Sequence, residues 1–464
     1  MRIPGADKAI ANLVKWSAKE EWNPYREQVF AEHFDMICDR FDITEEEIGD
    51  LLGDALDMVF SCVLEDFLTA RCGDEGEKNV IDDYLKRRGW REKVPAKRYL
   101  AALRDSVLSL YEVVALDPGH SMTVRDMVMG GDPITLEEKL GSESAALWDR
   151  IAGRIVTVNK KVYFTGSSLL FPHEVANDVL AGIDEMVKKL KRKLQREAKK
   201  QGVPADIRDR DLREMFLQTS ARLFIRTWLI DALGRALGPL PEIRNTDGDE
   251  IVFSEARFPI TGEVSKVIAG LDEIDAFERD NSNESRWTWH GLGSPSQRMS
   301  RGKDFTFDTD SDAGRTVLGS IEIANDALVL STNSQERADK GRDLLLSRLD
   351  ELIGPPLTSH QTLEKMLDER TGSAPVQSEL PPEVAEQAVH SYLDGHYRQT
   401  LDGPVPYLDD KTPRQAAKTK KGRAQVINWL KKLENSEYRR ASSQGQAPYS
   451  FQWMWRELGI DNPG

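Results

Sequence analysis

The residues best suited to act on another molecule form a basic run near residue 190. Residues 188–200 contain eight Lys or Arg residues and a single acid, Glu197. Each cation placed near a phosphate releases condensed counterions, so a basic helix can bind nucleic acid without reading its bases. The candidate phosphate contacts are Lys188, Lys189, Lys191, Arg192, Lys193 and Arg196. The alternative is a solvated helix face, which the absence of interleaved aromatic residues favours.

Two other groups suggest ligands but have simpler structural explanations. Trp287, Trp289 and His290 could form a stacking platform for bases, yet alternation along a strand places both Trp side chains on one face, where core packing is more common. An oxygen-rich cation loop is suggested by a cluster of aspartates, but the Gly and the terminal Glu of an EF-hand are missing, which favours an acidic solvent loop. The cluster consists of Asp304, Asp308, Asp310 and Asp312.

The histidines and cysteines give no metal or nucleophile pattern. His390 and His396 are six residues apart on an expected helix, so they lie on nearly opposite faces and do not share a metal. Three cysteines, Cys38, Cys62 and Cys72, fit reduced and buried thiols. We find no phosphate-binding loop, nucleophile elbow, HExxH sequence or CxxC pair. The sequence therefore predicts no catalytic residue, no metal and no cofactor, although a site formed by residues distant in sequence stays open.

Composition limits the class of protein. The chain has 464 residues, 39% of them hydrophobic, and a net charge of −15, which indicates several domains with a strongly charged exterior. The N-terminus lacks the apolar stretch of a signal peptide, and no apolar run is long enough to span a membrane. With sparse cysteines, these features predict a cytoplasmic protein without a membrane partner.

Hydrophobic periodicity and turn residues predict a multidomain α+β chain. The expected segments are a helical domain (1–108), a small antiparallel β-barrel-like domain (109–172), basic and apolar helices (173–240), an α+β domain (241–355), a linker (356–384) and a C-terminal helical domain (385–464). In the first segment, Thr44 and Glu47 form the sequence signature of a capping box.

The β-rich segments follow from short strands separated by turn residues. Between residues 109 and 172 several strands lie close together in sequence, which predicts a small curled sheet or barrel. In the α+β segment, Asp247 and Gly248 predict the turn of a hairpin over residues 242–253. A second hairpin is expected to turn at Asn325 and Asp326, and a helix over 335–353 closes the segment.

The C-terminal segment contains the most distinctive local sequence. Thr412 is an expected helix cap with Pro413 at the first helical position, and Thr419 to Gly422 marks the entry to a second helix. Val426, Trp429, Leu430 and Leu433 form the apolar stripe of that helix. The pattern predicts a compact helical hairpin.

This arrangement of Leu, Thr-Pro, Thr-x-x-Gly-Arg, Val and Leu resembles the toxin-binding domain of the MbcA/ParS/Xre antitoxin family. The resemblance implies that the hairpin binds a protein partner, for which a toxin is the candidate. The residues implied in partner binding are Leu408, Thr412, Pro413, Gly422, Arg423, Val426 and Trp429.

Other stretches, including residues 110–126 and 245–248, are similar to uncharacterised bacterial proteins that often carry a SEC-C zinc motif. The cysteines of that motif are missing here, so zinc is not implied. The sequence thus predicts a non-enzymatic, intracellular protein-interaction protein of bacterial type. Nucleic-acid binding through the basic helix is the alternative.

Overall fold

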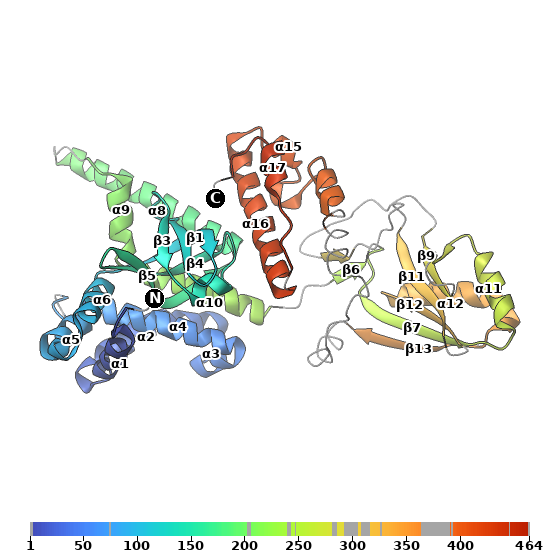
Figure 1. The fold of residues 1–464 in the computed structure, drawn as a ribbon, viewed down its shortest axis with the longest axis horizontal. Helices are drawn as coiled ribbons and strands as arrows, with labels where there is room; N and C mark the ends of the chain where they lie inside the picture. Colours follow the sequence, from blue (N-terminus) through green and yellow to red (C-terminus); the bar gives the residue numbers. More distant parts are fainter. Residues whose placement is uncertain are drawn as a thin grey trace. The chain divides into compact units, whose positions relative to one another are not determined.

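The computed structural model describes residues 3–73, 76–201, 206–238, 243–245, 247–280, 285–291, 305–307, 316–324, 327–362, 390, 393–444 and 446–462. The chain divides into two compact units. The first unit combines residues 1–238 with residues 378–464, and the second consists of residues 239–377. The expected multidomain α+β class is confirmed (Figure 1).

The first unit begins with a helical layer. Thr44 caps α3 through a capping box with Glu47, as the sequence predicted, and Asn79 caps α5 by accepting a hydrogen bond from the backbone N–H of Asp82. The α-helices are α1 (Ala6–Ser17), α2 (Asn23–Phe41), α3 (Glu45–Leu52), α4 (Asp54–Thr69), α5 (Val80–Arg88) and α6 (Val94–Arg104), with 3₁₀ turns η1 (Glu20–Trp22) and η2 (Gly89–Arg91).

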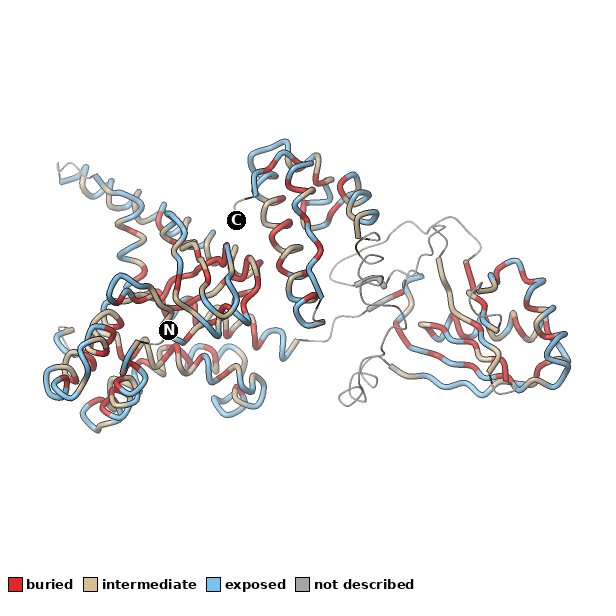
Figure 2. The backbone as a smooth tube through the Cα atoms, in the orientation of Figure 1, coloured by how far each residue is buried: buried red, intermediate tan, exposed pale blue. Residues whose placement is uncertain are grey.

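An antiparallel sheet of five strands follows the helical layer, in the order β3-β2-β1-β4-β5. Its strands are β1 (Leu108–Asp117), β2 (Ser121–Asp126), β3 (Ile134–Glu137), β4 (Arg150–Val158) and β5 (Lys161–Phe171), with the short helix α7 (Leu140–Ser144) before β4. The central strand β1 is buried on both faces over its first seven residues, as Figure 2 shows along the sheet. One face packs against the helices, and the other encloses a smaller cluster around Val113 and Val124.

The expected barrel is wrong, because the sheet curls without closing. Irregularities in register between Val113 and Ala115 and between Gly153 and Ile155 bend β1 and β4, as bulges do. The curl brings the edge strands near enough for Lys161 to form an ion pair with Glu137 at 3.0 Å. However, the pairing of strands ends at β3 and β5, so no ladder of hydrogen bonds joins the two edges.

Three helices complete this layer. The predicted helix over 173–200 is confirmed as α8 (His173–Lys200), whereas the apolar helix expected over 212–237 is split into α9 (Asp209–Leu217) and α10 (Ala221–Ala236). The apolar residues of these helices share one core with the helical layer and the outer face of the sheet. The segments from the N-terminus to residue 238 therefore fold around a common core.

The C-terminal part of the first unit is helical. It consists of a helical stretch over residues 393–400, the 3₁₀ turn η4 (Pro406–Leu408) and helices α15 (Pro413–Ala416), α16 (Lys420–Gln444) and α17 (Gln452–Glu457). Its own apolar core includes Leu408, Val426, Leu430 and Trp455.

The second unit is an antiparallel sheet of six strands, in the order β13-β7-β12-β11-β9-β8, that packs against two helices. The strands are β7 (Val252–Pro259), β8 (Phe277–Arg279), β9 (Arg286–His290), β11 (Val317–Ala324), β12 (Ala327–Thr332) and β13 (Leu357–Thr362), and the helices are α11 (Val264–Asp272) and α12 (Gln335–Leu349), followed by η3 (Asp350–Leu352). The second predicted hairpin is confirmed by the antiparallel register of β11 and β12, although its turn residues lie outside the described residues.

The first predicted hairpin of this unit is described only at its turn. Strand β6 (Ile243–Asn245) pairs in parallel with β10 (Phe305–Phe307), whereas β7 pairs with β12 and β13. The side chain of Asn245 accepts hydrogen bonds from the backbone N–H groups of Asp247 and Asp249. The backbone N–H of Asn245 donates to the backbone oxygen of Asp249 at 2.9 Å, so the chain turns at Asp247 and Gly248 as predicted. Residues 357–362, expected in the linker, instead form the edge strand β13.

Candidate functional site

The residues that the resemblance implied in partner binding mostly build the interior of the C-terminal helices. Leu408 and Val426 are fully buried, Trp429 is 6% exposed, and Pro413 is also buried. Thr412 caps α15 by accepting a hydrogen bond from the backbone N–H of Gln415. These positions have structural roles that need no partner.

Gly422 and Arg423 have local roles as well. Gly422 lies against the backbone oxygen of Ala416, which a Cβ atom would hit. Arg423 is exposed along part of its side chain and donates a hydrogen bond to the backbone oxygen of Gly459. Of the implied residues, Arg423 presents the most polar surface to solvent.

Helix α16 also binds the sheet of the first unit through a second, polar face. Its residues Asn428, Lys431, Asn435 and Arg439 are spaced three or four apart, so they lie along one side of the helix. Lys431 donates to Glu112 of β1 at 2.6 Å, and Arg439 donates to both carboxylate oxygens of Asp149 at 2.7 Å. Helix α16 thus contributes one face to its own core and the other to the sheet.

The ionic contacts between α16 and the sheet are unusually buried. Glu112, Arg150 and Lys431 are 3%, 1% and 6% exposed. The guanidinium of Arg150 donates to the backbone oxygen of His173 at 2.7 Å and to the side-chain oxygen of Asn428 at 3.2 Å. Burial lowers the pKa of both Arg150 and Lys431, while Glu112 opposes this shift in each. Charges buried to this extent hold a fixed geometry because each needs its partners.

Trp148 anchors the same contact. It is fully buried and has a φ of 67°, a backbone conformation that costs a bulky residue on the order of 1–3 kcal/mol. Its indole N–H donates to Glu434 of α16, and the ammonium of Lys431 lies 4.4 Å from the ring centroid. Burial raises the pKa of Glu434. The strained conformation is therefore held by contacts with α16.

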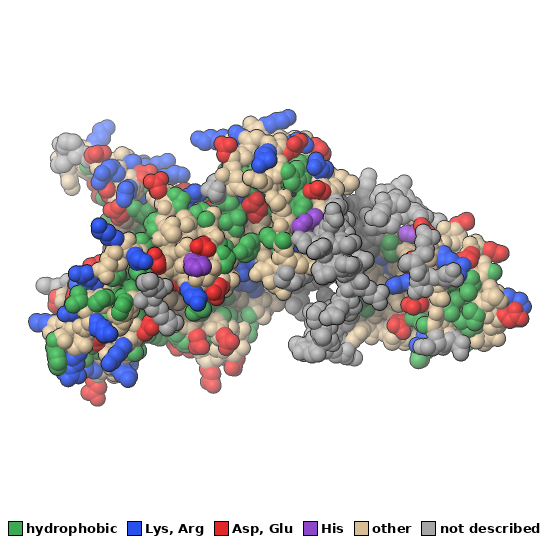
Figure 3. Space-filling model, in the orientation of Figure 1, with side chains coloured by type: hydrophobic (Ala, Val, Ile, Leu, Met, Phe, Trp, Pro, Cys, Tyr) green, Lys and Arg blue, Asp and Glu red, His purple; other side chains and the backbone are tan. Residues whose placement is uncertain are grey.

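The basic residues of α8 lie on a different surface and remain available. Lys188, Lys189, Arg192, Lys193 and Arg196 are all exposed, whereas Lys191 is partly covered and forms an ion pair with Asp209 of α9 at 2.7 Å. Figure 1 shows the ends of α8 and α9 extending away from the sheet, and Figure 3 shows Lys and Arg side chains gathered on this extension. We call the exposed cations from Lys188 to Arg196 the basic face.

Other sequence candidates have packing roles. Trp287 and Trp289 are 0% and 5% exposed in the core of the second unit, so neither ring can stack on a base. His390 packs on Tyr449, and His396 packs on Tyr397. The aspartates of the expected cation loop, Asp304, Asp308, Asp310 and Asp312, lie outside the described residues.

Two of the three cysteines, Cys62 and Cys72, are buried as expected, whereas Cys38 is half-buried. Cys38, Cys62 and Cys72 are free, and burial is the main cause that raises the pKa of each thiol. Among the described residues, no group of three or more His, Cys, Asp and Glu side chains is placed to hold a metal ion. In the same part of the chain, no helix has both the length and the apolar character needed to cross a bilayer.

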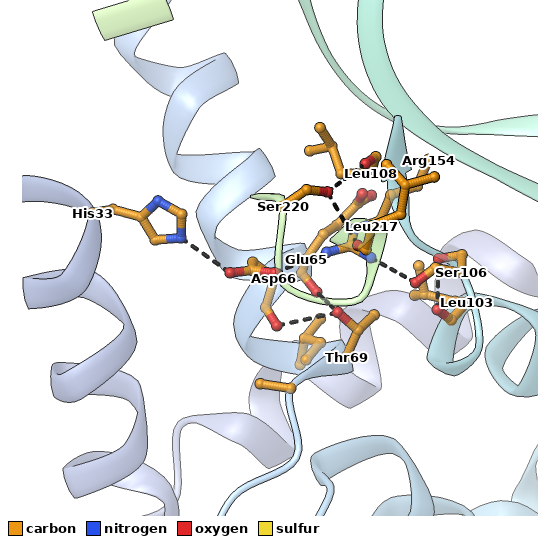
Figure 4. A network of polar contacts seen from close by, with 12 residues as sticks. His33, Glu65, Asp66, Thr69, Leu103, Ser106, Leu108, Arg154, Leu217 and Ser220 are labelled. Carbon is orange, nitrogen blue, oxygen red and sulfur yellow. Dashed lines mark hydrogen bonds and ion pairs between the residues drawn. The ribbon is translucent and has the colours of Figure 1, made fainter. Parts of the chain in front are cut away.

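A network that sequence analysis missed connects α2, α4 and β4. His33 Nε2 and Asp66 Oδ2 are 3.1 Å apart, and Asp66 Oδ1 accepts a hydrogen bond from Arg154 at 2.9 Å (Figure 4). Arg154 also donates to the backbone oxygen of Ser106 at 2.7 Å. Nothing in the local sequence marks these residues, because 33 and 88 residues separate the partners of Asp66 from it.

Comparison with known proteins finds one family model that is similar to part of the first unit. Residues 63–201 match the model of a family of unknown function (DUF7986). The match begins inside α4, covers the sheet and ends just after α8, so it includes Asp66, Glu112, Arg150 and the basic face. No curated protein matches the chain.

Proposed function

We propose that the protein binds double-stranded nucleic acid through the basic face of α8. The observation that supports this proposal is the exposure of Lys188, Lys189, Arg192, Lys193 and Arg196 on a chain whose net charge is −15. Positions 189, 193, 196 and 200 recur every three or four residues, so they form a continuous stripe along the helix. Such a stripe can follow a row of phosphates.

The composition of the helix favours a duplex over a single strand. Between residues 173 and 217 the only aromatic side chain apart from His173 is Phe216, which is partly buried. Single-strand binding proteins stack bases on exposed aromatic rings, whereas duplex backbones can be bound by cations alone. We therefore expect binding that depends on salt and shows little dependence on sequence.

The same helix is poorly suited to insertion into an anionic membrane. Interfacial helices bury an apolar face in the lipid. The apolar stripe of α8, which includes Val179, Ile183 and Val187, is already buried in the core of the first unit. Apart from Met186, which is 40% exposed, the surface of α8 left to solvent is mostly charged or polar. Such a surface favours contact with phosphate groups over contact with acyl chains.

Binding of a fluorescent duplex of about two helical turns, measured by anisotropy over a salt series, tests the proposal. The double variant Arg192→Glu/Arg196→Glu should weaken binding at low salt by at least about tenfold and reduce the slope of log K against log salt by roughly 2. Arg192→Lys/Arg196→Lys should retain most of the affinity. Lys420→Glu/Lys421→Glu changes the net charge equally at another exposed pair and should bind like the wild type.

Absence of duplex binding at low salt would overturn the proposal, as would equal losses in the two glutamate variants. Binding to anionic vesicles without binding to duplex would also overturn it, because a membrane would then be the target. The solvated-face alternative predicts the first of these results.

Partner binding through the C-terminal hairpin stays a second prediction from sequence. The implied residues lie inside the C-terminal core, and the polar side of α16 is occupied by Glu112 and Asp149. A partner would therefore have to contact the remaining exposed surface near Arg423 or displace α16. Arg423→Glu should abolish capture of such a partner from the native host, and unchanged capture would exclude this surface.

A further inference from the structure

A polar cleft of about 670 Å³ lies in the first unit, away from the basic face. It opens where α2, the ends of α4 and α6, strand β4 and the start of α10 meet. Its volume falls within the range of pockets that hold small molecules. Nothing in the proposed nucleic-acid function uses it.

Four arginines contribute to the lining, namely Arg71, Arg104, Arg154 and Arg222. Arg222 forms an ion pair with Glu32 at 3.1 Å and keeps 44% of its side chain exposed. Arg71 pairs with Asp82 at 3.3 Å and keeps 58% exposed. A guanidinium carries five N–H donors, so each of these ion pairs leaves Arg222 and Arg71 with N–H donors that can bind another acceptor.

The start of α10 adds to the positive potential of the cleft. Ala221 and Arg222, the first residues of this helix of 16 residues, line the cleft. No described side chain caps the helix, because the hydroxyl of Ser220 donates to the backbone oxygens of Leu108 and Leu217 instead. The first turn contains no acid. An arginine at the positive end of a helix dipole is unfavourable by itself and is stabilised by a bound anion.

Three carboxylates also line the cleft: Glu32, which pairs with Arg222, Asp105, which pairs with Arg104, and Asp66. Asp66 keeps 22% of its side chain exposed while His33 and Arg154 hold its two oxygens in place. His33 is fully buried behind it, and Arg154 is 3% exposed (Figure 4). Thr69 and Ser106 line the cleft beside Asp66. A carboxylate fixed in this way is a hydrogen-bond acceptor for sugar or polyol hydroxyls.

We infer that the cleft binds a small phosphorylated metabolite that also carries hydroxyl groups. The phosphate lies against Arg222, Arg71 and the start of α10, because guanidinium groups and helix N-termini both favour phosphate oxygens. The hydroxyl groups donate to Asp66. This assignment uses the partly exposed guanidinium groups of Arg222 and Arg71 and the carboxylate of Asp66, which His33 and Arg154 hold in place.

Calorimetric titration of the full chain with inorganic phosphate, ribose 5-phosphate, adenosine 5′-monophosphate and ribose tests the inference. We expect at least one of the two phosphorylated sugars to bind about tenfold more tightly than inorganic phosphate, and ribose to bind no more tightly than phosphate. Arg222→Gln should weaken binding of that ligand by roughly tenfold. Arg235→Gln, at the other end of α10 and 64% exposed, serves as the matched control and should leave affinity unchanged.

Arg71→Gln provides a second test that does not depend on the fold of α10, and it should also weaken binding. The inference is overturned if neither phosphorylated sugar binds, if both bind no more tightly than inorganic phosphate, or if Arg222→Gln and Arg235→Gln have equal effects. Because the basic face lies on another surface, Arg192→Glu/Arg196→Glu should leave this titration unchanged, so the two proposals can fail separately.

Discussion

The ammonium of Lys431 donates a hydrogen bond of 2.6 Å to the carboxylate of Glu112, a residue 319 positions earlier in the chain. Both side chains are almost fully buried, at 8% and 4% exposure. This pair fixes α16 on the sheet, and its burial makes it sensitive to loss of either partner.

Lys431→Met should therefore lower the free energy of unfolding by about 3 kcal/mol, because Glu112 would remain buried without its closest partner. The neighbouring Lys432 pairs with Glu174 at the surface, with 43% and 50% of the side chains exposed. Lys432→Met should cost less than about 1 kcal/mol. Urea unfolding of both variants measures the difference, and equal costs would show that the buried pair contributes no more than a surface pair.

Glu65 should make the stability of the protein depend on pH above the range in which a glutamate carboxyl ordinarily titrates. Burial raises its pKa to about 7 from 4.5, although Arg154 and Thr165 partly oppose the shift. Between these values the folded protein keeps a proton that the unfolded chain has lost, so stability falls as pH rises through this window.

The slope for this one group can approach about 1.4 kcal/mol per pH unit. Glu65→Gln should remove it, so the variant should gain stability relative to the wild type between pH 5 and pH 7. The unfolding free energies of the wild type and of Glu65→Gln, measured at pH 5 and at pH 7, test this prediction. Parallel profiles would mean that Glu65 titrates normally.

His173 should make the stability of the protein change with pH in the direction opposite to that of Glu65. Burial, together with Arg150, lowers its pKa to about 4 from 6.5. The unfolded chain binds a proton that the folded protein does not, so stability falls as pH drops from about 6.5 towards 4. The two ring nitrogens have no hydrogen-bond partner among the described residues.

His173→Leu removes these buried polar atoms and should flatten the acidic side of the stability profile. At pH 7 the variant should be neutral or more stable by about 1 kcal/mol. Thermal unfolding from pH 4 to pH 7 measures both effects. A variant that loses stability on acidification as steeply as the wild type would contradict the assignment.

Gly422 distinguishes a structural role from a partner-binding role in the C-terminal helices. Gly422→Ala should cost about 1–3 kcal/mol because the added Cβ collides with the backbone oxygen of Ala416. Gly395→Ala is the control, since its Cβ would meet no described atom within 4 Å and helix propensity favours alanine by about 1 kcal/mol. Chemical unfolding should show a loss for the first and a gain for the second; a neutral Gly422→Ala would remove the packing explanation.

Local patterns predicted local structure well. The capping box at Thr44, the helix over 173–200 and the pairing of β11 with β12 are confirmed, because each depends on residues close in sequence. The prediction of a barrel was wrong because closure of a sheet does not depend on residues close in sequence. Strand spacing predicts a curled sheet, but closure depends on how far two register irregularities bend it.

The long-range sites could not be read from the sequence. Lys431 looks like one more surface lysine in a charged helix, and only its position opposite Glu112 gives it a buried role. Asp66 likewise acquires its setting from His33 and Arg154, which lie on other elements. The basic face is the exception, since its charges are adjacent in sequence and the structure leaves them exposed.

The contact between α16 and the sheet also has a consequence for synthesis of the chain. Trp148 and Asp149 are separated from their partners Glu434 and Arg439 by 286 and 290 residues. At translation rates of about 5–20 residues per second, α16 is synthesised roughly 15 to 60 seconds after the sheet. During that interval the second unit is synthesised in full. Trp148 and Asp149, which α16 later covers, stay accessible to water and to chaperones. The first unit therefore cannot complete its fold until α16 has been synthesised.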